Sequence, residues 1–285
     1  MAGQNLENIK RRLSTVTSTK KITNAMKLVS SVKVTKLTSF YGARKKYFNN
    51  ISKIYDNSIF YSINNPEATY NNPYLVSNNL SNKTLYIVVT SSLGLCANHN
   101  HNIIKEFKNS YKNGDEVFAI GTKGYEELHN DDIRINTDFI DVINDLSFAN
   151  INALKNKLCD IYVQNEYKEI RIIYSDYVNT LISKPKNEVL LPLEIKTQNN
   201  RGYSPVYEPK KDKFINDLVD EFLIAKLFYY LADSKLSEEN ARRNAMDNAT
   251  KNANDLIDKL YLEYNKARQS AITQEITEVI AGSKK

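Results

Sequence analysis

Both ends of the chain lack helix-breaking residues over long stretches and carry apolar residues at helical spacing. Between Lys210 and Ala281 there is neither glycine nor proline, and Pro209 and Gly282 bracket the stretch. At about 1.5 Å per residue, it predicts a rod of roughly 105 Å, several times the length of an ordinary globular helix. Apolar or alanine side chains recur along it in steps of three and four, at Met246, Ala249, Ala253, Leu256, Leu260, Tyr264, Ala267 and Ala271.

The opening of the chain predicts a second long helix. Between Gln4 and Asn65 it has one glycine, Gly42, and no proline. Its apolar stripe comprises Leu6, Ile9, Leu13, Val16, Ile22, Met26, Val29, Val32, Leu37 and Phe40. Because alanines in the terminal stripe let two backbones approach closely, we expect the two ends to wind together as an antiparallel coiled coil. Residues 17–21 interrupt the stripe, which leaves open separate packing of the two helices on the middle of the chain.

The middle of the chain has the pattern of an α/β domain. The continuous apolar run at residues 85–90 is typical of a buried parallel strand. Further strands are expected at 117–120, 133–135, 170–174 and 189–193, with helices at 100–112, 123–128 and 147–164. This alternation predicts a Rossmann-like sheet with crossover helices.

The proline-containing segments 49–82 and 194–213 are expected to be connectors, the first of them ending the opening helix. The sequence therefore predicts a first shaft helix (1–60), an α/β domain with its connectors (61–208) and a second shaft helix (209–285).

Composition is that of an ordinary soluble protein, with 41% hydrophobic and 25% charged residues. No apolar run is long enough to span a membrane and no signal-peptide pattern opens the chain, so a cytosolic location is expected. Cys96 and Cys159 are too few for a disulfide framework and are expected as buried thiols.

Charge is distributed unevenly along the chain. The formal net charge is +6, but residues 1–48 contain eleven Lys and Arg and a single acid, Glu7. Residues 233–285 contain nine of each sign. A basic first helix beside a neutral second one favours a partner surface that is acidic, although a solvated face is the simpler interpretation. Because residues 1–39 have no aromatic residue and no nucleic-acid motif occurs, nucleic acid is not an expected partner.

No pattern in the sequence predicts catalysis or a cofactor. The turn after the first strand, SSLGLCAN at residues 91–98, has one glycine and lacks the phosphate-binding motifs GxGxxG and GxxxxGK[ST]. Cys96, His99 and His101 do not form a metal-ligand set, because residues two apart diverge on a helix and no second cysteine is near. A Cys–His nucleophile pair lacks a third group to orient it. We expect no catalytic residue, metal or cofactor.

Several segments together resemble one family, the gamma subunit of F-type ATP synthases. They are LENIKRR (6–12), TKKITNAMKLV (19–29), VTSSLGLC (89–96), Arg242 with NAMDNAT (244–250), and YNKARQSAITQE (264–275). The match has the family's order and length. Vacuolar-type rotor subunits share a helical shaft but lack a comparable α/β domain, so the expected strands disfavour them.

The resemblance implies a bacterial rotor subunit without catalytic activity, bound peripherally at the cytoplasmic face of the membrane. Its end helices would fill the axis of a ring of alpha and beta subunits, while its α/β domain would act as a foot that holds the epsilon subunit and stands on the membrane ion ring. Contact with a beta subunit would involve Met26, Lys27, Arg242, Arg268, Gln269 and Thr273. From spacing alone, Arg268 and Gln269 are interpreted as exposed helix surface.

The turn after the first strand departs from the family. The family has an Asp-Arg pair where this chain has Ser92 and Leu93, and glycines where it has Ala97 and Asn98. We expect Ala97 to avoid positive φ and Asn98 to tolerate it. The resulting foot loop, which consists of Ser92, Leu93, Gly94, Leu95 and Cys96, puts the ring contact in question. Two alternatives therefore remain, a shaft in an ATPase motor that is not coupled to a membrane ring and a coiled-coil scaffold without an ATPase.

Overall fold

The computed structural model describes residues 2–63, 72–76, 78, 81–164, 166–194, 208 and 211–282. Two long helices begin and end this described chain, α1 (Ala2–Ile63) and α5 (Lys211–Gly282). The chain forms two compact units, each of which contains part of both helices. We call residues 1–32 with 242–285 the shaft unit, and residues 33–241 the α/β unit. Both boundaries between these units fall inside the long helices.

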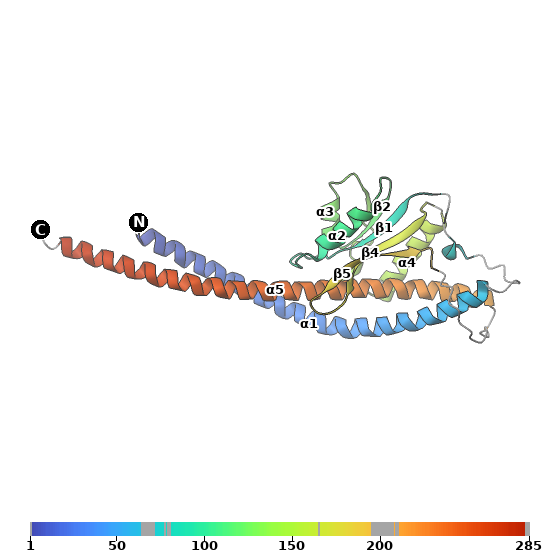
Figure 1. Ribbon diagram of the computed structural model, residues 1–285, viewed down its shortest axis with the longest axis horizontal. Coiled ribbons are helices and arrows are strands. Elements are labelled where there is room, and N and C mark those ends of the chain that lie inside the picture. The colour runs from blue at the N-terminus through green and yellow to red at the C-terminus, as the bar shows by residue number, and fades with distance from the viewer. Residues whose placement is uncertain are drawn as a thin grey trace. The chain divides into compact units, whose positions relative to one another are not determined.

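The α/β unit is built on one five-stranded sheet with strand order β3-β2-β1-β4-β5 (Figure 1). The strands are β1 (Thr84–Val89), β2 (Glu116–Ile120), β3 (Arg134–Asn136), β4 (Glu169–Tyr177) and β5 (Ser183–Leu191). The first four pair in parallel and β5 pairs antiparallel to β4. Three helices accompany them, α2 (His99–Ser110), α3 (Thr122–Leu128) and α4 (Phe148–Val163), with short 3-10 turns η1 (Pro73–Leu75) and η2 (Val142–Asn144).

Strand alternation sends side chains of β1 into two separate cores. Tyr86 and Val88 pack with α2 and α3 on one face of the sheet. Leu85, Ile87 and Val89 pack on the other face with α4 and the parts of α1 and α5 that belong to this unit. Because both faces are covered, β1 is buried at every position, as the continuous apolar run predicts. The expected fold class, a Rossmann-like α/β domain with long terminal helices, is confirmed.

The opening helix extends farther than the connector prediction allowed. α1 continues to Ile63, so its residues 49–63 are helical and not part of a connector. The cause is tertiary packing, because Tyr55 and Ile59 are each 1% exposed and Tyr55 stacks on Phe222 of α5. Burial of this size outweighs the weak helix propensity of a segment rich in asparagine. Most of the other expected connector, residues 194–213, and Pro66 lie outside the described residues.

The second half of the sheet also differs from the sequence prediction. β5 begins at Ser183, six residues before the strand expected at 189–193, and β4 runs to Tyr177. The early part of β5 is polar because it lies at the sheet edge, where Pro185 costs no ladder hydrogen bond to a further strand. Apolar runs identify buried strands, and a half-solvated edge strand has no such run.

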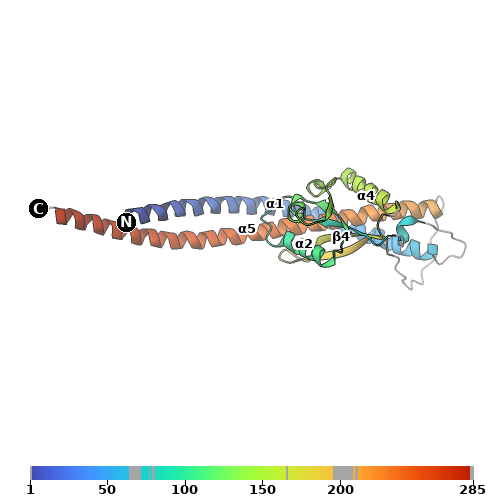
Figure 2. The same cartoon turned by 90° about the horizontal axis from the view of Figure 1, so that it is seen from above.

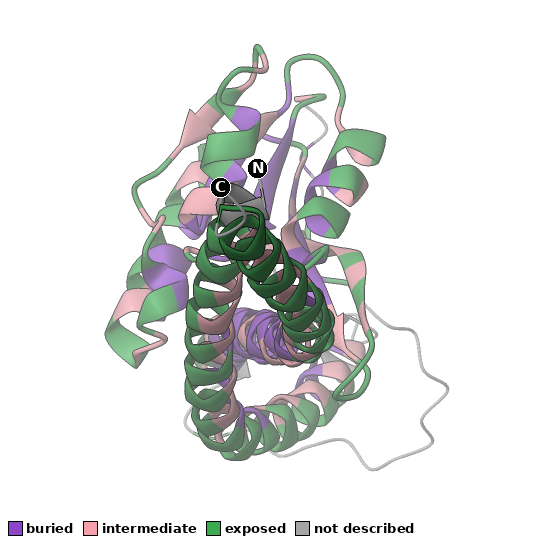
Figure 3. Cartoon of the chain, turned by 90° about the vertical axis from the view of Figure 1, so that its left-hand side faces the viewer, coloured by how far each residue is buried: buried purple, intermediate pink, exposed green. Residues whose placement is uncertain are grey.

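In the shaft unit, the first half of α1 and the last half of α5 run side by side, and the N- and C-terminal ends lie at the same end of the pair (Figures 1 and 2). Seen from that end, most of the outer turns are exposed (Figure 3). The expected antiparallel pairing of the two ends is therefore present. The alternative was that the two helices pack separately on the middle of the chain. Only their segments 33–63 and 211–241 belong to the α/β unit.

Candidate functional site

The seam of the shaft unit is held by polar as well as apolar pairs. Thr250 Oγ1 donates a hydrogen bond of 2.9 Å to Thr23 Oγ1, and both side chains are 9% exposed. One turn away, Lys27 Nζ lies 2.8 Å from Asp247 Oδ1. Moving forward along α1 from Thr23 to Lys27, the partner on α5 moves backward from Thr250 to Asp247. This order defines the register of an antiparallel pair.

Asp247 connects the two helices electrostatically. Its carboxylate accepts from Lys251 on the same helix at 2.7 Å and from Lys27 on α1 at 2.8 Å. Hydrogen bonds from Lys251 first and Lys27 second lower the pKa of Asp247 to about 2. Lys27, which the resemblance assigns to a beta-subunit contact, thus already has a partner within its own chain.

The predicted contact residues differ in accessibility. Arg268, Gln269 and Thr273 are exposed, and Thr273 Oγ1 donates to the Gln269 carbonyl at 2.9 Å. Because residues four apart lie above one another on a helix, Gln269 and Thr273 share one face. Met26 and Lys27 are half-buried, and Arg242 is only 3% exposed. The structure therefore presents three of the six to solvent in full.

The shaft unit also exposes large apolar side chains. On α1 these are Ile22, Leu28, Val29 and Val32, all more than half exposed, and near the end of α5 they are Ile272, Ile276, Val279 and Ile280. Ile22, Val29 and Val32 were expected in the seam, but the buried positions beside them are Thr23 and Ser30. The spacing of the last four, at i, i+4, i+7 and i+8, could have been recognised in the sequence as a second stripe. Contiguous exposed apolar surface of this kind is typical of a surface that a partner covers.

The foot loop follows β1 and has an exposed rim over a buried base. Leu93 and Leu95 are 62% and 61% exposed, whereas Cys96 is 2% exposed. Ser91 Oγ donates to the Leu93 carbonyl at 2.7 Å and fixes the turn. Ser92 and Gly94 are half-buried.

The backbone of this turn contradicts one expectation. Ala97 adopts φ of +50° and Leu95 φ of +63°, while Asn98 has φ of −86°. The prediction that Ala97 avoids positive φ was wrong. The surrounding hydrogen bonds, including Ser91 N to Asn100 Oδ1 at 3.0 Å, hold the loop in this conformation despite the side chains.

Neither a cluster of metal ligands nor a reactive thiol at Cys159 occurs among the described residues. No three His, Cys, Asp or Glu side chains among them are placed to hold a metal ion. Burial raises the pKa of the Cys159 thiol to about 11, so it is protonated at neutral pH and a poor nucleophile. None of the helices in the described part of the chain is both long and apolar enough to cross a membrane.

A long antiparallel helix pair with exposed apolar faces, joined in one chain to an α/β unit, defines a shaft-like assembly subunit. Residues 5–284 match the family model described as ATP synthase. The chain is 37% identical over 286 residues to the ATP synthase gamma chain of Clostridium kluyveri, covering 99% of both chains. It is 34% identical over 290 residues to that of Mycoplasma capricolum, covering 98% of both. The chain belongs to the gamma subunit family of F-type ATP synthases.

Solved structures agree on the fold. A chain of the Euglena gracilis mitochondrial ATP synthase superposes with a TM-score of 0.67 at 16% identity, covering 99% of this chain and 94% of that one. A chain from the Tetrahymena thermophila mitochondrial ATP synthase central stalk and c-ring gives 0.58 at 21% identity, covering 80% and 99%. Family membership makes this protein the non-catalytic rotor shaft of an F-type ATP synthase.

Proposed function

We propose that the exposed face of α5 around Arg268, Gln269 and Thr273 contacts a beta subunit of the catalytic ring and transmits torque to it. The observation that carries the proposal is the accessibility of these polar side chains next to the exposed apolar stripe from Ile272 to Ile280. The apolar stripe suits a close-fitting surface, and the arginine fork suits a carboxylate. Met26 and Lys27 would contribute from α1, with Arg242 the least accessible of the set.

Asymmetry around the shaft supports this role. A rotor can bias the conformations of ring subunits only if it makes different contacts with each of them. In residues 6–32, α1 carries six Lys and Arg and one acid, whereas α5 carries both signs beside it. A beta-subunit surface would therefore meet a basic face at one angle of rotation and a mixed face at another. This basic face complements an acidic partner.

The α/β unit would provide a second attachment. We propose that it binds the epsilon subunit and stands on the membrane ion ring, which would hold the assembly peripherally at the cytoplasmic face of a bacterial membrane. Its exposed Leu93 and Leu95 favour an apolar partner at the foot loop, because desolvating leucine assists association.

The experiment is ATP hydrolysis by the complete complex in native membranes, with wild-type chain and with Arg268→Ala plus Gln269→Ala. Loss of a charged hydrogen-bonded contact costs about 1.5–3 kcal/mol, so turnover should fall roughly tenfold or more while nucleotide binding in the ring persists. Lys259→Ala, at an exposed position nine residues before Arg268 on the same helix, is the control and should retain wild-type turnover. Unchanged turnover in the double variant would contradict the proposal and indicate that both side chains are solvated and contact no beta subunit.

The same membranes test coupling. An inhibitor of the ion-conducting ring should suppress hydrolysis by the wild-type complex if the shaft is mechanically linked to that ring. Full activity in its presence, with no ring protein in the preparation, would instead favour an uncoupled ATPase motor.

A further inference from the structure

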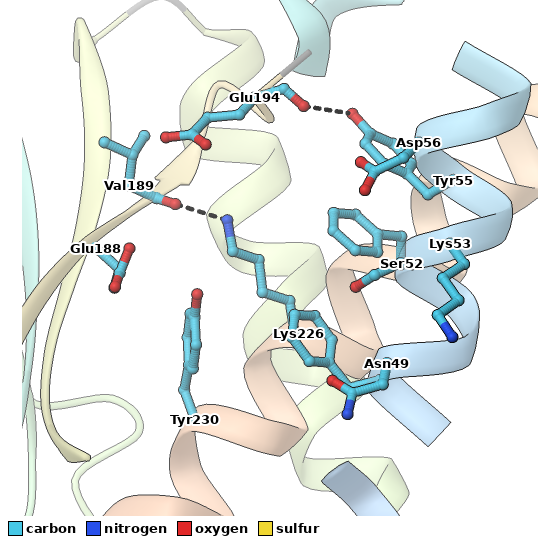
Figure 4. Close-up of a pocket in the computed structure, with 12 residues that line it drawn as sticks. Asn49, Ser52, Lys53, Tyr55, Asp56, Glu188, Val189, Glu194, Lys226 and Tyr230 are labelled. Carbon is cyan, nitrogen blue, oxygen red and sulfur yellow. Dashed lines mark hydrogen bonds between the residues drawn. The ribbon is translucent and has the colours of Figure 1, made fainter. Parts of the chain in front are cut away.

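The α/β unit contains a cavity of about 440 Å³ between α1, β5 and α5 (Figure 4). About two and a half turns of α1 form one wall, from Phe48 to Asp56, and the end of β5 with Glu194 forms another. The segment of α5 that includes Phe222, Lys226 and Tyr230 lies between them. The volume falls within the range of small-ligand sites, and all of its lining residues belong to one compact unit.

Aromatic rings form the apolar part of the lining. Tyr55 and Phe222 stack with centroids 4.1 Å apart, and Phe48 stacks on Phe222 at 5.9 Å. The Tyr55 hydroxyl is 3.5 Å from the Glu194 carbonyl, which ties α1 to the end of the sheet. Because Tyr55 and Phe48 both stack on Phe222, these rings cover one another's faces and together form an apolar wall.

One buried polar group points into the cavity without a hydrogen bond among the described residues. Tyr230 is 7% exposed, and Figure 4 shows its hydroxyl directed toward the space between Glu188 and Lys226. Burial first, and Glu188 second, raise the pKa of this hydroxyl, so it stays neutral and able both to donate and to accept. Because this oxygen lies in the open space of the cavity, it is available to a ligand there.

Carboxylates supply the charge. Glu188 and Glu194 line the cavity, and within the described part of the chain neither carboxylate forms a hydrogen bond or ion pair. With Asp56 they make three acids against the two lysines of the lining, Lys53 and Lys226. Lys226 Nζ is directed at the backbone, where it donates to the Val189 carbonyl at 2.7 Å. The cavity therefore presents hydrogen-bond acceptors beside an apolar wall, with one more acid than base in its lining.

We propose that this cavity binds an organic cation, a guanidinium or alkylammonium group, between the carboxylates of Glu188 and Glu194 and the hydroxyl of Tyr230. A guanidinium fits best, because its planar fork of donors matches the geometry of carboxylates. The group could be carried by a free small molecule or by an arginine side chain of a partner protein, since both present the same chemistry. An anion would face the two glutamates at close range and is disfavoured.

The test is calorimetric titration of the full-length chain with two probes, agmatine for a free cation and N-acetyl-arginine amide for a protein-borne one. Glu188→Gln with Glu194→Gln should weaken binding about tenfold, because each removes a charged acceptor while keeping shape. Glu127→Gln, at an exposed position on α3, is the matched control and should bind as the wild type does. Circular dichroism of each variant verifies that it is folded.

Lys226→Met makes the test sharper, because it keeps the apolar stem and removes a like charge. The proposal predicts that this variant binds agmatine more tightly than the wild type. Binding of agmatine alone assigns the site to a small cation, and binding of both probes assigns it to the guanidinium group whatever carries it. Absence of binding by both, affinity unaffected by the glutamine changes, or phosphate binding that Lys226→Met abolishes would overturn the proposal.

Discussion

At the residue scale, Asp233 of α5 is a buried carboxyl group in the α/β unit whose pKa is strongly raised. Its side chain is fully buried and accepts a hydrogen bond of 2.9 Å from the Tyr177 amide at the end of β4. Burial, with a further contribution from the neighbouring Asp176, raises its pKa to about 8. Asp176 itself pairs with Lys186 at 3.0 Å. Asp233 is therefore largely protonated at neutral pH in the folded chain but ionised in the unfolded chain.

Because the folded pKa is raised, the stability linked to this proton is complete below about pH 4 and is lost progressively as pH rises toward 8. Asp233→Asn keeps an oxygen for the Tyr177 amide and removes the titration. The melting temperature of this variant should exceed that of the wild type by several degrees at pH 8.5, and the difference should shrink toward pH 4.5. Asp132→Asn, at an exposed position, is the control and should show no such trend. A constant difference across pH would contradict the assignment.

At the element scale, the sequence predicted those features that depend on local pattern. Both long helices were identified from the absence of glycine and proline, and β1 from its apolar run. The position of the seam was predicted less well on α1, because Ile22 and Val29 are exposed while Thr23 and Ser30 are buried. Apolar spacing cannot separate a face that buries within the chain from one left for a partner. For the same reason the candidate contacts came from family resemblance and not from spacing.

The continuity of α5 is tested by Ala253→Pro. Ala253 is 8% exposed in the shaft seam, and proline there removes a helical hydrogen bond and clashes with the preceding turn, at a cost of about 3 kcal/mol or more. Size-exclusion chromatography of the coexpressed complex should show loss of assembly. Ala253→Gly costs about 1 kcal/mol and should still assemble. Normal assembly and turnover with the proline would be incompatible with an uninterrupted helix in the working complex.

At the scale of the whole molecule, one chain combines a shaft unit that leaves apolar side chains exposed with an α/β unit whose core is closed on both faces of its sheet. The α/β unit has the burial expected of a domain that folds around its own core, whereas the shaft unit leaves many of its large apolar side chains exposed. This division suits a subunit whose shaft unit is surrounded by a ring and whose α/β unit is attached to another partner, as proposed above.

The central claim is that this chain rotates within the catalytic ring, and single-molecule observation of rotation tests it most directly. With the ring fixed to a surface, a probe is attached to the α/β unit through Glu127→Cys on α3. The two native cysteines of this chain are at most 5% exposed, so labelling within the chain should be selective for the introduced thiol. On addition of ATP, the account predicts rotation in one direction that stops when ATP is removed. Steady ATP hydrolysis by the labelled complexes, with the probe fixed in orientation, would contradict it.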